Sequence, residues 1–161
     1  MRPWLEPTAR SQSMADLPLP LQRRRAFTDS SAYLALLDEN DRNHETAIQL
    51  LEWLADQRYR QYTTNAMLFE AHALILSELG SRQASQFLRD ILRSSTIIIR
   101  VRASDEERAR DILFRYTDKT FSYNDALSFV IMERLGIDLA FTFDRDFVDY
   151  GLNILNLQYI R

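Results

Sequence analysis

Short apolar segments alternate with longer amphipathic ones from residue 26 onward, and this alternation constrains the fold more than any other feature of the sequence. Segments rich in β-branched and aromatic residues, which are typical of strands, lie at 26–28, 59–63, 96–101, 139–143 and 153–157. Apolar residues between them recur at helical spacing, as in 47–54, 84–91 and 109–116. Strands that alternate with helices pair in parallel. We therefore predict a doubly wound α/β domain, with a mainly parallel sheet of four to five strands flanked by helices.

Capping residues predict where several helices begin. Asp41 is the expected N-cap of the helix that contains residues 47–54, and Ser104 opens an expected capping box that ends at Glu107. The segment 66–76 is hydrophobic on almost every side, which predicts a largely buried helix. His72 on this helix is expected to be a packed core residue rather than a general base.

The N-terminal residues differ from the rest of the chain. All four prolines lie at or before Pro20, in a stretch without apolar periodicity, which predicts an arm over 1–25 that is disordered or loosely packed, followed by one domain over 26–161. The arm has five arginines against two acids, or +3, whereas the domain has 15 basic residues against 21 acids, or −6. Overall charge therefore does not attract a polyanion to the domain.

Composition excludes several kinds of chemistry. The chain has no cysteine and only two histidines, so neither thiol catalysis nor a zinc site of cysteine and histidine ligands is available. A metal would have to be bound by oxygen, which favours Mg²⁺ or Mn²⁺. No apolar run is long enough to span a membrane and no hydrophobic signal core is present, so we expect a cytoplasmic protein without a membrane partner.

Four acids stand out by their positions. Asp29 and Asp144 directly follow expected strands, and ligands of open parallel sheets bind at the carboxyl ends of the strands. Glu70 and Asp125 lie in apolar helical segments, where a carboxylate is costly to bury. If the four converge without a nearby lysine, divalent cations would have to supply the compensating charge. Each also has a structural explanation: Asp29 and Asp125 as helix caps, Glu70 as the partner of an arginine, and Asp144 as a turn former.

Four short motifs contain these acids in order. They are Phe27-Thr28-Asp29-Ser30-Ser31, Thr63-Thr64-Asn65 with Glu70, Ser122-Tyr123-Asn124-Asp125-Ala126-Leu127-Ser128, and Thr142-Phe143-Asp144-Arg145-Asp146-Phe147. In sequence and spacing they resemble the motifs of the PIN-domain ribonucleases, specifically the VapC-like toxin branch, from about Ala26 to Gly151. The resemblance does not cover the arm. The chain departs from the family pattern at Thr28, where an aliphatic residue is usual, and at Asn124, where a hydroxyl residue is common.

The resemblance implies an Mg²⁺- or Mn²⁺-dependent endoribonuclease that hydrolyses RNA phosphodiester bonds by in-line attack of water. The family's metal ligands and catalytic residues correspond to Asp29, Glu70, Asp125 and Asp144. Family residues that orient or support this site correspond to Ser30, Asn65 and Thr142, and Asp146 is close enough in sequence to be a substitute ligand. Arg145, beside the acids, is a candidate phosphate contact, although a solvated surface position explains it as well.

The resemblance also implies partners. The expected ones are an RNA substrate, a small antitoxin protein of a VapBC-like toxin-antitoxin pair, and a second copy of the chain in a homodimer. The alternative is a catalytically silent module of the same fold that binds RNA or a protein. A phosphoacceptor receiver domain is disfavoured because it needs a lysine beyond a late strand, and the only lysine, Lys119, precedes the Asp125 helix. A haloacid-dehalogenase-type phosphatase is disfavoured because it needs a second aspartate two residues after Asp29, where this chain has Ser31.

Overall fold

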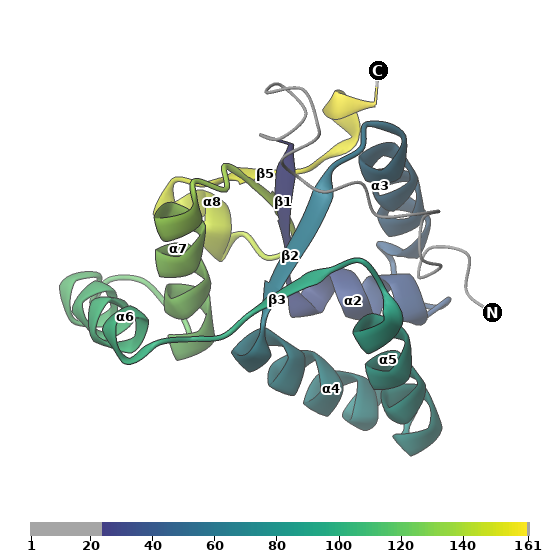
Figure 1. The fold of residues 1–161 in the computed structure, drawn as a ribbon, viewed down its shortest axis with the longest axis horizontal. Coiled ribbons are helices and arrows are strands. Elements are labelled where there is room, and N and C mark those ends of the chain that lie inside the picture. The colour runs from purple at the N-terminus through teal and green to yellow at the C-terminus, as the bar shows by residue number, and fades with distance from the viewer. Residues whose placement is uncertain (1–23, 161) are drawn as a thin grey trace.

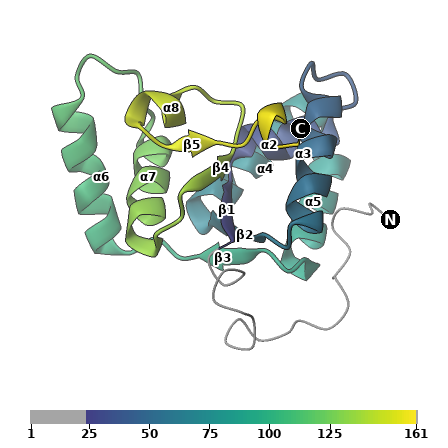
Figure 2. The same ribbon diagram turned by 90° about the horizontal axis from the view of Figure 1, so that it is seen from above.

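The computed structural model describes residues 24–160 and contains a five-stranded parallel sheet. Its strands are β1 (Arg25–Thr28), β2 (Arg60–Thr64), β3 (Ile97–Ile99), β4 (Leu139–Phe141) and β5 (Asn153–Ile154). They lie in the order β3-β2-β1-β4-β5, and every neighbouring pair is parallel (Figure 2). The chain moves outward from β1 to β3 and then returns to the other side of β1 with β4. The predicted fold class is therefore confirmed, and the strand order reverses between β1 and β4.

Helices connect the strands and cover both faces of the sheet. They are α2 (Ser30–Leu37), α3 (His44–Asp56), α4 (Asn65–Leu79), α5 (Ser81–Arg93), α6 (Ala103–Arg115), α7 (Tyr123–Leu135) and α8 (Asp146–Tyr150), with a 3₁₀ turn at Leu157–Tyr159. Figure 1 shows α6, α7 and α8 on one side of the sheet, and α2, α3 and α5 on the other. This arrangement leaves the carboxyl edge of the central strands open for a site.

The central strand β1 illustrates why both faces are covered. Successive side chains of a strand point to opposite faces, so Ala26 packs with residues of α2 and α3, whereas Phe27 packs with residues of α6 and α7. A third cluster joins α4 and α5 to Tyr33 of α2. Because β1 is apolar on both faces, it must lie in the interior of a parallel sheet.

Strands β3, β4 and β5 end earlier than the sequence predicts. β3 stops at Ile99 and β4 at Phe141, although apolar residues continue to Val101 and Phe143. Directly after β4, the Thr142 hydroxyl donates a hydrogen bond to Asp29. β5 is only two residues long and lies at the edge of the sheet.

Two predicted helix starts are wrong. The N-cap of α3 is Asn43, and Asp41 instead accepts a hydrogen bond from the Asn43 N–H at 2.7 Å in the preceding turn. Helix α6 begins at Ala103, one residue before the expected cap Ser104. Its box is closed by Asp105, whose Oδ2 accepts from the Arg102 N–H at 3.0 Å.

The prediction that α4 is largely buried is also wrong. Leu68, Ala71 and Ile75 are buried against α2 and α5, and Met67 is buried in the cluster that contains residues of α6 and α7. However, Phe69 is 71% exposed and Glu70 is exposed as well. Helix α4 lies at the carboxyl end of β2, where no further layer covers its outer side (Figure 1). His72 is half-buried rather than a core residue.

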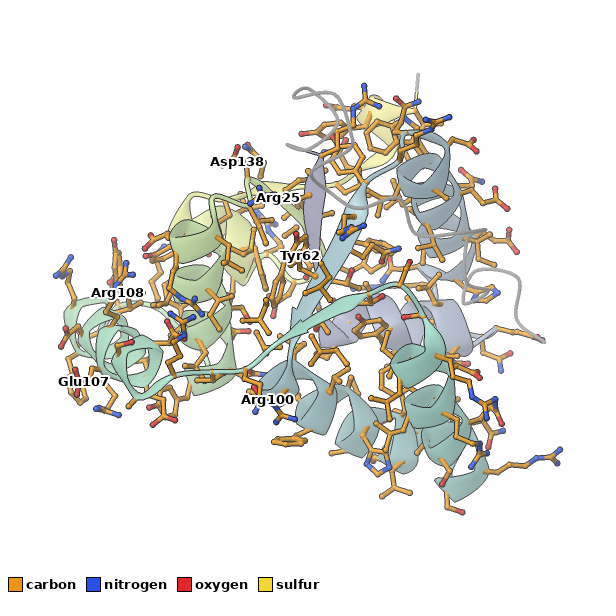
Figure 3. All side chains as sticks on the ribbon, viewed as in Figure 1. Arg25, Tyr62, Arg100, Glu107, Arg108 and Asp138 are labelled. Carbon is orange, nitrogen blue, oxygen red and sulfur yellow. The ribbon has the colours of Figure 1, made fainter. Side chains whose placement is uncertain are left out.

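The sheet includes the last residue of the expected arm, since β1 begins at Arg25. Arg24 is attached as well, because its Nη1 donates to the Gln57 carbonyl at 2.6 Å. The prediction for residues 1–23 lies outside the described residues. Among the helices of residues 24–160, none has the length and apolarity needed to cross a membrane. Figure 3 shows Arg25 at the amino end of the sheet and Arg100 at its carboxyl end.

Candidate metal centre

The switch point between β1 and β4 places two acids next to each other. Thr28 is in register with Phe141, so the residues that follow these two strands leave the sheet side by side. Asp29 follows β1 directly and Asp144 follows β4 after two residues. Helices α4 and α7 carry Glu70 and Asp125 to the same end of the sheet, as the hydrogen bonds described below establish.

Asp29 is a buried carboxylate with three donors on one oxygen. Its Oδ2 accepts from the Ser31 N–H at 3.1 Å, from the Ser31 hydroxyl, and from the Thr142 hydroxyl at 3.0 Å. It is the N-cap of α2, as the structural explanation anticipated. Burial raises the pKa of Asp29, and the negative charge of Glu70 adds to this effect, while the hydrogen bonds oppose it. No hydrogen bond from residues 24–160 reaches Oδ1, which is thus left for another partner.

Thr142 and Ser31 form the hydroxyl network around this carboxylate. The Thr142 Oγ1 accepts from the Asp144 N–H at 2.9 Å, and the Ser31 Oγ accepts from the Phe143 N–H at 3.0 Å. Each hydroxyl therefore donates to Asp29 and accepts from the loop after β4. The network fixes the Asp29 carboxylate relative to Asp144.

Asp125 lies in the first turn of α7 and is buried. Its Oδ2 accepts from the Ser122 N–H at 2.7 Å, and its own N–H donates to the Ser122 Oγ at 3.0 Å. Burial, together with the negative charges of Asp144 and Asp29, raises the pKa of Asp125 to about 6, although the Ser122 hydrogen bonds act in the opposite direction. Asp125 thus lies within electrostatic reach of both strand-end acids.

Asp146 belongs to the same group of acids. Asp125, Asp144 and Asp146 each offer a carboxylate oxygen, and these three atoms lie within 4.8 Å of one another. The Asp146 N–H donates to the Asp144 Oδ1 at 2.9 Å, which makes Asp144 a turn former. Burial and the charges of Asp144 and Asp149 raise the pKa of Asp146, although Lys119 lowers it.

Glu70 faces the site from the exposed side. Its Oε1 accepts from the Ser30 hydroxyl at 2.7 Å and its Oε2 from the Asn124 amide at 2.6 Å. The sequence suggested an arginine as the alternative partner, but within residues 24–160 no ion pair includes Glu70. Glu70 is also outside the three-acid group of Asp125, Asp144 and Asp146.

The remaining candidate residues are divided between the site and its surroundings. Ser30 contacts Glu70 rather than Asp29. Asn65 does not contact the acids, because its Oδ1 accepts from the Val101 N–H at 2.9 Å and so attaches the segment after β3 to α4. Arg145 is exposed between Asp144 and Asp146.

The donor set fits a hard divalent cation. Apart from the Asn124 amide that contacts Glu70, the polar side chains that converge here offer carboxylate or hydroxyl oxygen, which Mg²⁺ and Mn²⁺ prefer. In the described part of the chain, the ion pairs of basic residues involve Glu133, Glu106, Asp149 and Asp105, and none involves Asp29, Asp125 or Asp144. The protein therefore leaves several carboxylate charges uncompensated at one place, which two divalent ions would balance.

Sequence reasoning did not identify two residues at the site. The first motif contains Ser31 but assigns it no role, yet a hydroxyl two residues after an N-cap aspartate can return to that carboxylate. Asn124 was noted only as a departure from a family pattern, although it contacts Glu70. An amide directly before Asp125 gave no local signal, because its partner is 54 residues away in the chain.

The chain is similar to known proteins over most of its length. The PIN-domain family model matches residues 26–152. The chain is 34% identical over 125 residues to the 23S rRNA-specific endonuclease VapC20 of Mycobacterium tuberculosis, an alignment that covers 78% of this chain and 93% of the relative. Among solved structures, the crystal structure of M. tuberculosis VapC20, described as a sarcin–ricin loop cleaving toxin, superposes with a TM-score of 0.73 at 32% identity, covering 79% of this chain and 95% of that one.

Proposed function

The chain belongs to the PIN-domain family, in its VapC-like toxin branch, and from this premise we propose that it is a divalent-metal-dependent endoribonuclease that hydrolyses RNA phosphodiester bonds. The observation that supports the activity most directly is the meeting of Asp29, Asp125 and Asp144 without a basic partner at the switch point of the sheet. A silent binding module would have no need to maintain several unpaired carboxylates so close together, since their mutual repulsion is costly.

Asp29, Glu70, Asp125 and Asp144 are the proposed ligands of Mg²⁺ or Mn²⁺, and Asp146 supports them. When bound, the cation supplies charge stabilisation to the attacking and leaving oxygens of the phosphodiester. Ser31 and Thr142 orient Asp29 through its Oδ2 and keep Oδ1 available. Ser122 orients Asp125 through its backbone N–H, which donates to the Asp125 Oδ2. These neutral donors fix the carboxylates without neutralising them.

Two exposed arginines support contact with RNA. Arg145 stands between two of the acids, and Arg100 lies at the carboxyl end of β3 (Figure 3). Both are at the edge of the sheet where the phosphate backbone would have to approach. Phosphate contacts of this kind position a nucleic acid without reading its sequence.

The relatives support a proposal for the substrate and the partners. VapC20 is described as specific for 23S rRNA, and its crystal structure is described as that of a toxin that cleaves the sarcin–ricin loop. We propose that the substrate of this chain is ribosomal RNA of the same class. As the toxin of a VapBC-like pair, it would act in the cytoplasm, be inhibited by a small antitoxin and form a homodimer. A neighbouring reading frame that encodes a small DNA-binding protein would support the toxin assignment.

Cleavage of a defined RNA tests the activity. Purified protein should cut an oligonucleotide that contains the sarcin–ricin loop when Mg²⁺ or Mn²⁺ is added, and EDTA should stop the reaction. A hairpin with the same stem and a shuffled loop measures sequence preference, and Asp125→Asn controls for contaminating nuclease. Equal cleavage by the wild type and Asp125→Asn, or cleavage in EDTA, would contradict the proposal.

A further inference from the structure

The Asn124 side chain contributes little to the stability of α7. It is the second residue of α7, and the capping hydrogen bonds of this helix are made by Ser122 and Asp125 instead. Asparagine is a poor helix former because its amide competes for backbone hydrogen bonds. In addition, the Asn124 Oδ1 is buried without a hydrogen-bond partner among the described residues. Local structure therefore does not account for this side chain.

The contacts of the Asn124 Nδ2 group explain why an amide side chain lies here. Nδ2 donates to the Glu70 Oε2 at 2.6 Å and lies 3.7 Å from the Met67 Sδ, both on α4. Met67 is fully buried and its Sδ also accepts from the Ser30 N–H at 3.2 Å. A charge-assisted hydrogen bond of this length is among the stronger neutral-to-ion contacts. Asn124 thus contacts α4 at the point where Glu70 leaves it.

Glu70 is held from two sides by this arrangement. Ser30 donates to Oε1 and Asn124 to Oε2, so rotation of the carboxylate about its last bond would break both hydrogen bonds. Ser30 directly follows Asp29, and Asn124 directly precedes Asp125. Because Glu70 is exposed and has no ion pair within residues 24–160, these two donors are what restrain it.

We propose that Asn124 is a positioning residue that, with Ser30, fixes the Glu70 carboxylate between Asp29 and Asp125 for metal binding, an inference that rests on the proposed function. Each carboxylate oxygen has two lone-pair directions, so Glu70 keeps one free on each oxygen for a cation or a water. Asn124 itself does not touch the cation. It acts through Glu70, and its effect should vanish when Glu70 is absent.

Calorimetric titration with Mn²⁺ alone tests this proposal without relying on activity. Asn124→Leu removes the donor at similar size and should weaken Mn²⁺ affinity by about 10- to 100-fold, as is usual when a residue that orients a metal ligand is lost. Asn40→Leu is the matched control, since Asn40 is exposed in the turn after α2 and should leave the affinity unchanged. Thermal unfolding without metal verifies that the variants fold, and Asn124→Ala replaces Asn124→Leu if the latter does not.

A double-mutant comparison separates positioning from a merely structural role. In the Glu70→Ala background, adding Asn124→Leu should change Mn²⁺ affinity by less than about twofold, because the side chain that Asn124 orients is gone. Wild-type affinity in Asn124→Leu, or an equal loss in both backgrounds, would overturn the inference. Failure of the proposed function looks different: the wild type would then not bind Mn²⁺, or Asp125→Asn would bind it as well as the wild type does.

Discussion

Ser122 and Asp125 exchange hydrogen bonds at the start of α7, with the Ser122 N–H donating to the Asp125 Oδ2 at 2.7 Å and the Asp125 N–H donating to the Ser122 Oγ at 3.0 Å. The same carboxylate belongs to the group of three acids with Asp144 and Asp146. Asp125 therefore has two roles with different requirements. The helix cap needs an acceptor atom, whereas a metal centre needs a negative charge.

Asp125→Asn should separate these two roles. The amide oxygen can still accept from the Ser122 N–H, so the free energy of unfolding should not fall more than about 1 kcal/mol below that of the wild type. Metal-dependent RNA cleavage should fall by more than about 100-fold, because a charged ligand is lost. Urea unfolding and single-turnover cleavage measure the two effects.

Ser122→Ala is the complementary control. It removes the cap acceptor and should cost about 1 kcal/mol of stability, but it leaves the Asp125 charge in place and should reduce cleavage by less than about tenfold. The interpretation of Asp125 would be wrong if the serine variant lost more activity than the aspartate variant.

Stability of the metal-free protein should depend on pH through Asp125. Burial raises its pKa to about 6 in the folded protein, against 3.8 for an unperturbed aspartate. The folded state thus binds this proton more tightly than the unfolded chain, so the contribution to stability is complete below 3.8 and is lost as the pH rises through about 6. The pKa values of Asp29 and Asp146 are raised in the same direction.

The expected result is a thermal midpoint in EDTA that falls as the pH increases from about 5 to about 7. Asp125→Asn should show a shallower slope and a higher midpoint at the upper end of this range. Mn²⁺ should reverse the trend, because it binds the ionised carboxylates. A midpoint in EDTA that rises over the same range would contradict the assignment of these raised pKa values.

The fold and the four acids were predictable because their signals are local. Strand and helix periodicities are visible within windows of a few residues, and the parallel sheet follows from their alternation. The sequence identifies Asp29 and Asp144 because the ends of parallel strands meet at one edge of a sheet, and the reversal of strand order between β1 and β4 brings these two ends together.

What the sequence did not predict depends on contacts between distant elements. Asn124 and Ser31 are ordinary residues until their partners on other elements are known. The exposure of Glu70 was missed because an apolar helix does not reveal whether a layer covers each of its sides. The start of α6 was missed because its N-cap is Arg102, which is not a typical capping residue, and Asp105 closes the box on the Arg102 N–H.

Thr142→Val should affect both stability and activity. The buried hydroxyl donates to Asp29 and accepts from the Asp144 N–H, and valine has the same shape without these contacts. A hydrogen bond to a charged group contributes about 1.5–3 kcal/mol, so the free energy of unfolding should fall by that amount. Cleavage should fall as well, since Asp29 loses a donor that orients it. Thr117→Val, at an exposed site, is the control and should leave both quantities unchanged.

Asp105 offers a test of stability away from the metal centre. Its side chain is 2% exposed. Its Oδ2 accepts from the Arg134 Nη2 at 3.0 Å, and its Oδ1 lies 2.9 Å from the Arg134 Nε in an ion pair that attaches α6 to α7. Asp105→Ala leaves a mostly buried guanidinium unpaired and should lower the free energy of unfolding by about 3 kcal/mol. Arg110→Ala breaks the exposed pair with Glu106 and should cost less than about 1 kcal/mol. The Ser122 cap holds Asp125 independently of α6, so folded Asp105→Ala protein should retain its cleavage rate. A loss of cleavage under conditions in which the variant is folded would show instead that α6 helps to position the acids.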